Sequence, residues 1–320
     1  MRWSKSLVRR VRKLVLGISL AVGSAAAGDL AYVTCQNGDA LFVHDLSSET
    51  IVYEWSVPGK PAGIAVTRVS AYTVSAASKT LRRFAADTGD VLAMTELDGG
   101  PIGVALDATR QRLFVSDWYN ARIWVLSADT LALQGELTVG AAPAGLAVSD
   151  DGNFIAAAER DEDQISIFDA ETLELLRTVA VGIRPFGLRF APDGRLFVGN
   201  VGSNDLSVIN PGEGELITTV AVGERPYGIA FAKGRAFVTN QYENTLSVVD
   251  LKTLVVIDTI DTGDYPEGID TSSDGRQIIV ANWFDNSLTI VDAESHSVLR
   301  TLETCDGPRA FGEFVLGGEP

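Results

Sequence analysis

The sequence contains few residues that support metal or redox chemistry. Among its 320 residues are only two cysteines, two histidines and two methionines. A metal or haem site built on these side chains needs several convergent ligands, yet His44 and His296 occupy different positions and no C-x-x-C-H motif is present. Nucleotide-binding and serine-hydrolase fingerprints are also missing. We therefore expect no catalytic residue, no metal site and no cofactor.

Basic residues are scarce and unevenly distributed. The chain has 26 Lys and Arg against 42 Asp and Glu, and six of the basic residues lie within residues 1–27, which contain no acid. Residues 28–320 therefore carry a formal charge of −22. A surface this acidic repels phosphate backbones, so we expect no nucleic-acid binding. It favours solubility, and it would suit a basic partner.

Long apolar runs are missing except near the N-terminus. There, a basic stretch is followed by the apolar run Leu14–Val22 and then by Ser24-Ala25-Ala26-Ala27. This order is typical of a secretory signal peptide. The run is shorter than the roughly 20 residues that a membrane-spanning helix needs, which disfavours a membrane anchor. We predict a signal peptide over residues 1–27, cleavage after Ala27, and a periplasmic or secreted mature chain that is not inserted in a membrane.

A repeat of about forty residues fills the rest of the chain. The triplet Pro-x-Gly begins at Pro61, Pro101, Pro143, Pro185, Pro226 and Pro266, with a degenerate copy at Pro308. A short β-rich run begins at Tyr32, Tyr72, Phe114, Ile155, Phe197, Phe237 and Ile279. Successive copies of both features are 40 to 42 residues apart. Such a period indicates a repeat architecture and leaves no residues for a second domain. We therefore predict one domain over residues 28–320.

Each repeat predicts four strands, which we term a, b, c and d. In the clearest unit they are Pro226–Phe231, Ala236–Asn240, Thr245–Asp250 and Val255–Ile260. Four-stranded units of this length indicate a β-propeller, whereas a solenoid would leave two open ends. The mature chain starts on a strand b and ends on an unpaired strand a, Arg309–Val315. We predict an all-β, seven-bladed propeller in which the C-terminal strand joins the N-terminal three and removes the open edges.

The positions of Cys35 and Cys305 provide a test of the predicted ring closure. Cys35 ends a strand b, and Cys305 lies three residues before Pro308, at the start of the last strand a. Strands a and b are antiparallel neighbours, so both thiols fall at one rim of the closing blade. We predict a Cys35–Cys305 disulfide, which an oxidising compartment permits. The alternative is two separate buried thiols.

Polar residues that recur at strand ends suit structural roles. The aspartates that end strand c are Asp45, Asp169, Asp250 and Asp292. The asparagines that end strand b are Asn200, Asn240 and Asn282. We expect the aspartates to accept hydrogen bonds in turns and the asparagines to cap backbone groups.

The repeats resemble the YVTN-repeat (YncE-like) bacterial β-propeller family. The resemblance rests on Phe237-Val238-Thr239-Asn240, on the V-G-x-x-P-x-G stretches at 181–187 and 222–228, and on N-T-L-S-V-V-D at 244–250. It covers nearly all of the mature chain and implies the propeller fold. Members include periplasmic propellers, surface-layer components and non-catalytic subunits of periplasmic amine dehydrogenases. Some propellers with similar repeats bind a modified haem or act as lactonases. The family therefore implies a fold more specifically than a function.

One rim of the ring should hold the functional residues. The b–c and d–a loops share that rim, and unlike the scaffold positions their side chains differ from unit to unit. The rim candidates are Trp118, Tyr119, Arg160, Arg184, Phe186, Arg225, Tyr227, Tyr242, Trp283, Phe284 and Arg309. Exposed aromatics with arginine are typical of binding surfaces, although aromatics can also pack between blades.

We interpret the protein as a monomeric, non-enzymatic binding or scaffold protein that holds a protein or small ligand at this rim. The resemblance adds a role as accessory to a periplasmic oxidoreductase. The alternative is a lactonase-like hydrolase with its site in the central channel. The apolar strand-a residues expected to face the channel, Ile64, Val104, Leu146 and Ile229, disfavour it.

Overall fold

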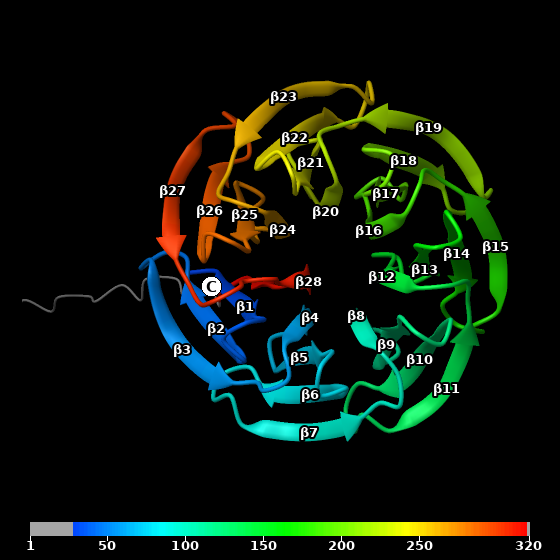
Figure 1. The fold of residues 1–320 in the computed structure, drawn as a ribbon, viewed down its shortest axis with the longest axis horizontal. Coiled ribbons are helices and arrows are strands. Elements are labelled where there is room, and N and C mark those ends of the chain that lie inside the picture. Colours follow the sequence, from blue (N-terminus) through cyan, green and yellow to red (C-terminus); the bar gives the residue numbers. More distant parts are fainter. Residues whose placement is uncertain (1–27, 319–320) are drawn as a thin grey trace, which may run out of the picture.

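A computed structural model describes residues 28–318, and all regular secondary structure in this range is β-strand. The strands form a ring of seven blades around a central axis (Figure 1). Blade 1 contains β1 (Leu30–Cys35), β2 (Ala40–Asp45), β3 (Thr50–Ser56) and β29 (Val315–Leu316). The seven-bladed, all-β prediction is confirmed. The predicted signal peptide, residues 1–27, lies outside the described residues.

Each of the other blades contains four consecutive strands arranged from the inside outwards in chain order, and blade 2 has β28 (Phe311–Glu313) as an additional strand at its inner edge. Blade 2 contains β4 (Pro61–Val66), β5 (Ser70–Ser75), β6 (Thr80–Ala85) and β7 (Val91–Glu96), and blade 3 contains β8 (Pro101–Asp107), β9 (Arg112–Asp117), β10 (Arg122–Ser127) and β11 (Leu133–Thr138). Blade 4 contains β12 (Pro143–Val148), β13 (Phe154–Glu159), β14 (Gln164–Asp169) and β15 (Leu175–Ala180), and blade 5 contains β16 (Pro185–Phe190), β17 (Leu196–Asn200), β18 (Asp205–Asn210) and β19 (Glu215–Ala221). Blade 6 contains β20 (Pro226–Ala232), β21 (Arg235–Asn240), β22 (Thr245–Asp250) and β23 (Val256–Asp261), and blade 7 contains β24 (Pro266–Thr271), β25 (Gln277–Asn282), β26 (Ser287–Asp292) and β27 (Val298–Glu303). The Pro of each Pro-x-Gly triplet therefore begins an inner strand.

The C-terminal segment closes the ring in two steps rather than as one strand. β28 (Phe311–Glu313) pairs in parallel with β4 of blade 2, and β29 then pairs antiparallel with β1. The expected strand Arg309–Val315 is therefore split, although its end does join the N-terminal three strands. The break between β28 and β29 is stabilised by the carboxylate of Asp270, which accepts hydrogen bonds from the N–H groups of Phe314 (2.8 Å) and Val315 (2.9 Å).

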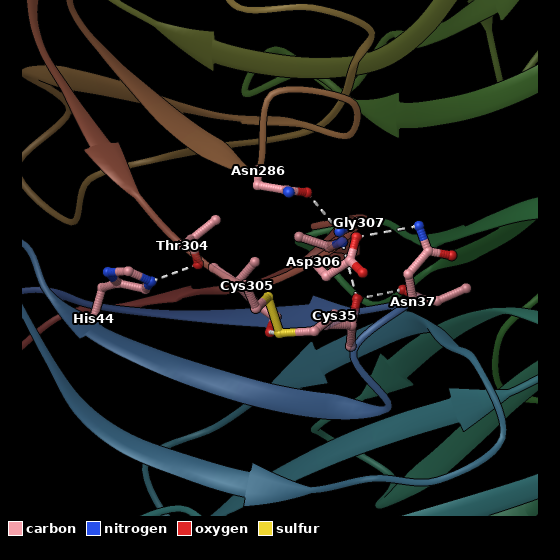
Figure 2. Close-up of a disulfide and its surroundings, with 12 residues drawn as sticks. Cys35, Asn37, His44, Asn286, Thr304, Cys305, Asp306 and Gly307 are labelled. Carbon is pink, nitrogen blue, oxygen red and sulfur yellow. Dashed lines mark hydrogen bonds between the residues drawn. A yellow bond between two sulfur atoms is a disulfide. The ribbon is translucent and has the colours of Figure 1, made fainter.

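The predicted disulfide is present in the closing blade. Cys35 and Cys305 are bonded, with their Cα atoms 5.6 Å apart and a sequence separation of 270 (Figure 2). Backbone bonds support the same junction, since the N–H of Gln36 donates to the carbonyl of Gly307 at 2.8 Å. The disulfide suggests an oxidising compartment. No helix within residues 28–318 is long and apolar enough to cross a membrane.

The glycine of Pro-x-Gly has a packing role between blades. A Cβ atom built on Gly145 would lie 2.5 Å from the carbonyl oxygen of Phe186 in the next blade, and Gly228 meets the carbonyl of Glu267 at the same distance. The neighbouring hydroxyl completes the contact, because Thr239 Oγ1 donates to the Glu267 carbonyl at 3.2 Å. The two repeated motifs thus fix the approach of adjacent blades around the axis.

The strand-end aspartates accept turn hydrogen bonds as expected, but the asparagines behave differently. Asp250 Oδ1, for example, accepts from the N–H groups of Lys252 and Thr253. Asn240 Nδ2 instead donates to the hydroxyls of Thr245 (3.0 Å) and Ser247 (2.9 Å), and Asn200 and Asn282 make equivalent side-chain bonds. The expectation of backbone capping is wrong because strand c presents side-chain acceptors at these positions, which are hydroxyls except for the Asp205 carboxylate beside Asn200.

Burial of His44 near the disulfide predicts acid sensitivity. Its Nε2 lies 2.7 Å from Thr304 Oγ1, and burial lowers its pKa from 6.5 to about 4 (Figure 2). The unfolded chain therefore binds a proton between pH 6.5 and 4 that the folded protein excludes. Folding stability should fall by about 3 kcal/mol as the pH drops through this window. Urea unfolding of wild type and His44→Gln at several pH values measures the effect, and equal slopes for the two proteins would refute it.

Candidate functional site

The b–c and d–a loops lie on one rim of the ring, joined by backbone hydrogen bonds. The N–H of Trp118 donates to the carbonyl of Gly100, and that of Trp283 donates to the carbonyl of Tyr265. In each pair a b–c loop meets the d–a loop that leads into the same blade. The predicted rim is therefore a continuous surface, on which the candidate residues fall into separate groups.

The largest group is an aromatic patch over blades 6 and 7, made of Tyr242, Tyr265, Trp283 and Phe284. Ring centroids are 5.8 Å apart for Tyr242 and Tyr265, 4.8 Å for Tyr265 and Phe284, and 4.6 Å for Trp283 and Phe284. Tyr242 and Phe284 are 56% and 63% exposed. Arg225 covers the outer end of the patch, with its guanidinium 4.9 Å from the Tyr242 ring centroid. Sequence reasoning missed Tyr265, which lies in a d–a loop and links the other three rings.

Acidic side chains surround the aromatic patch. Those exposed in the same loops are Glu224, Glu243, Asp264 and Asp285. Arg225 is the one cation in these loops within the described residues. The surface thus combines exposed aromatic rings with a negative border, and it should favour a partner that is both apolar and basic.

The remaining rim candidates lie apart from the patch. The guanidinium of Arg160 lies 5.4 Å from the ring centroid of the half-buried Trp118. Tyr119 is 77% exposed, and Arg184 is also exposed. These residues come from blades 3 to 5, and Trp118 also packs on Phe186, with ring centroids 6.1 Å apart.

Phe186 and Tyr227 are not in the d–a loops, where the sequence placed them. They lie on the inner strands β16 and β20, because the preceding proline already begins the strand. Both are buried and pack with Phe311 of β28, with centroid distances of 4.5 Å between Phe186 and Tyr227 and 5.3 Å between Phe186 and Phe311. Three rings from three parts of the ring meet here, where β28 points into the centre (Figure 1). We call this cluster the axial plug.

A buried ion pair adjoins the axial plug. Arg309 Nε lies 3.1 Å from Glu267 Oε2, and Arg309 Nη2 donates to the Tyr227 hydroxyl at 2.5 Å. Gln241 donates to Glu267 at 2.6 Å. Burial raises the pKa of Glu267, and Arg309 and Gln241 oppose that rise. Arg309, a rim candidate, therefore binds residues of and beside the axial plug. Glu267 is a second residue that sequence reasoning missed.

The central channel holds a cavity below the plug. Its volume is about 300 Å³, and its walls include Val104, Leu146 and Ile229, as expected. Ile64 does not line it, because β28 pairs with β4 and covers that strand. Within residues 28–318, no group of three or more His, Cys, Asp or Glu side chains could hold a metal ion.

Family models match two overlapping parts of the chain. A YNCE-like beta-propeller model matches residues 200–317, and a model described as a lactonase, 7-bladed beta-propeller, matches residues 125–231. Each model covers less than half of the chain, so these matches show a similarity to YncE-like and lactonase propellers over the matched residues. No curated protein matches this chain.

Solved structures share the fold at low identity. A functionally unknown protein from Desulfotomaculum acetoxidans has a TM-score of 0.78 at 16% identity, with 91% of this chain and 99% of that chain covered. Kuenenia stuttgartiensis hydrazine synthase has a TM-score of 0.73 at 15% identity, with 87% and 99% covered. A dihydro-heme d1 dehydrogenase has a TM-score of 0.67 at 12% identity, with 93% and 77% covered. At these identities the likeness concerns the fold alone.

Proposed function

We propose that this protein is an exported, non-enzymatic binding protein that holds a partner protein at its aromatic patch. The observation that carries the proposal is the group of contacting rings, two of them more than half exposed, inside an acidic border. Exposed aromatic residues are typical anchors of protein interfaces. The border favours a partner with a basic surface.

Export follows from the predicted signal peptide and is consistent with the disulfide. We place the protein in the periplasm, or outside the cell, after cleavage at Ala27. Hydrazine synthase and a dihydro-heme d1 dehydrogenase have the same fold. A periplasmic oxidoreductase is therefore the partner class that we would test first.

The interaction can be tested by removing exposed rings from the patch. We expect Tyr242→Ala and Phe284→Ala to weaken partner binding at least tenfold, since a buried aromatic anchor typically contributes about 2 kcal/mol or more. Tyr119→Ala is the matched control, because Tyr119 is an even more exposed aromatic on the same rim outside the patch. A photo-crosslinking residue at 284 or at 119, followed by quantitative capture from periplasm, gives the measurement. Equal recovery at both positions, or full capture by the patch variants, would exclude the patch as the interface.

A lactonase-like hydrolase is the second candidate. The lactonase model match and the cavity in the channel favour it. The carboxylates of Asp107 and Glu267 line that cavity, although each is paired with an arginine. Turnover of a panel of lactones by wild type, but not by a cavity-filling variant, would establish this candidate in place of the binding protein.

A further inference from the structure

The central cavity adjoins the axial plug at one end and is bordered at its other end by the a–b turns. Its lining includes Phe311 of the plug at one end and Thr67, Thr109 and Asp150 of three a–b turns at the other. These turns lie at the opposite end of the blades from the predicted rim, because strands a and b are antiparallel. The cavity and the aromatic patch are therefore separate features on opposite faces.

The walls of the cavity are apolar and formed by the inner strands. The side chains that line them include Val104, Leu146, Leu188, Ile229 and Ile269, and each is less than a tenth exposed. A volume of about 300 Å³ falls at the lower end of the range for small-molecule sites. Such walls favour a compact aliphatic or aromatic body.

The charges around the cavity are mostly neutralised inside the protein. Asp107 pairs with Arg110 at 3.1 Å, and Glu267 pairs with Arg309 at the same distance. Asp270 pairs with Arg189 at 2.9 Å. These three acids therefore add little net charge to the cavity.

Two carboxylates at the mouth remain without full compensation. Asp150 is exposed and lines the cavity; it accepts no hydrogen bond from any described residue, and only its charge acts on Arg189. Glu313, whose side chain is 68% exposed, shares Arg189 with Asp270 at the longer distance of 3.3 Å. Because the single positive charge of Arg189 is shared among Asp150, Asp270 and Glu313, it offers little to an anion. The mouth thus favours a positive charge.

We propose that the cavity is a binding site for a small organic cation, with its apolar body between the inner strands and its cationic group at Asp150 and Glu313. The site combines an apolar enclosure with a negative entrance, so a neutral or anionic molecule of the same shape lacks half of the interaction. Binding should weaken with salt, since both carboxylates are exposed to solvent.

Three probes with one ring and different head groups test the proposal by calorimetry on the mature protein. They are cyclohexylmethylammonium, cyclohexylmethanol and cyclohexanecarboxylate. We expect the ammonium probe to bind at least about tenfold more tightly than the other two. Comparable binding of the alcohol, or no binding of the ammonium probe at millimolar concentration, would overturn the proposal.

Matched variants locate the site. The double variant Asp150→Asn/Glu313→Gln should weaken binding of the ammonium probe about tenfold. The control Glu224→Gln/Glu243→Gln removes the same charge from the opposite rim and should leave that binding unchanged.

The variant Leu146→Phe should abolish binding of the probe by filling the cavity, and its melting temperature is measured alongside. If Leu146→Phe does not fold, the exposed charge variants still decide. Equal weakening by both double variants would assign the effect to overall charge and refute this site. A negative result for the cavity would not bear on the proposed partner binding at the aromatic patch, since Tyr242→Ala and Phe284→Ala test the opposite face.

Discussion

Loss of the Cys35–Cys305 disulfide should lower the free energy of unfolding by about 5 kcal/mol. The bond closes a loop of 270 residues, so its removal frees nearly the whole chain from a constraint on the unfolded state. The closing blade depends on that constraint more than the others do. β29 contributes only the pairs Leu30↔Leu316 and Ala31↔Val315, whereas β1 and β2 share six.

Urea unfolding with and without reductant measures this effect. Wild type should lose stability on reduction, and Cys35→Ser/Cys305→Ser should resemble the reduced protein and be insensitive to reductant. Mass measurement under non-reducing conditions confirms the state of the thiols in each sample. Identical unfolding midpoints for oxidised wild type and the double variant would show that the strand contacts alone hold the ring shut.

The repeat made most of this fold predictable from sequence. Two motifs with one period gave the blade count, and the antiparallel order of strands a and b placed Cys35 beside Cys305. Strand bounds in the clearest unit differ by one residue at most, with β23 at Val256–Asp261 rather than Val255–Ile260. Local patterns succeed here because each blade repeats the same hairpin chemistry.

The tail and the axial plug were less predictable because they depend on contacts across the ring. β28 joins blade 2 rather than blade 1, with Asp270 of blade 7 fixing the turn towards β29. Nothing near Phe311 in sequence indicates that its ring meets Phe186. The middle residue of Pro-x-Gly carried an available signal, since it varies from alanine to Tyr227, Glu267 and Arg309.

In the candidate site, too, some features were predictable from sequence and others were not. Tyr242, Trp283 and Phe284 could be proposed because b–c loops are recognisable in each repeat. Their union into one patch requires Tyr265, whose place beside them follows from how blade 6 meets blade 7. The acidic mouth of the cavity was not predictable either, since Asp150 and Glu313 are far apart in sequence and belong to different structural elements.

Gly187→Ala should destabilise the protein by about 3 kcal/mol, the second largest effect that we expect from a single change. A Cβ atom on Gly187 would overlap the carbonyl oxygen of Tyr227, which belongs to the inner strand of the next blade. Gly187 and Tyr227 fall at irregularities in the strand pairing, but Leu188 and Ile229 close beside them are paired with Val198 and Val238. Relief of the overlap therefore requires blades 5 and 6 to separate at the axis. The axial plug, which includes Tyr227, would loosen with them.

Gly135→Ala provides the matched control, because Gly135 lies in the outer strand β11 and a Cβ there would meet no atom within 4 Å. Replacing Gly135 with alanine should stabilise the protein slightly, by roughly 0.5 kcal/mol, since glycine loses more conformational freedom than alanine on folding. Urea unfolding of both variants decides the matter. A Gly187→Ala protein as stable as Gly135→Ala would mean that the glycine of Pro-x-Gly does not set the distance between blades. A large loss confined to Gly187→Ala would establish that close backbone approach at the axis, and not local strand preference, accounts for the glycine of the Pro-x-Gly triplets.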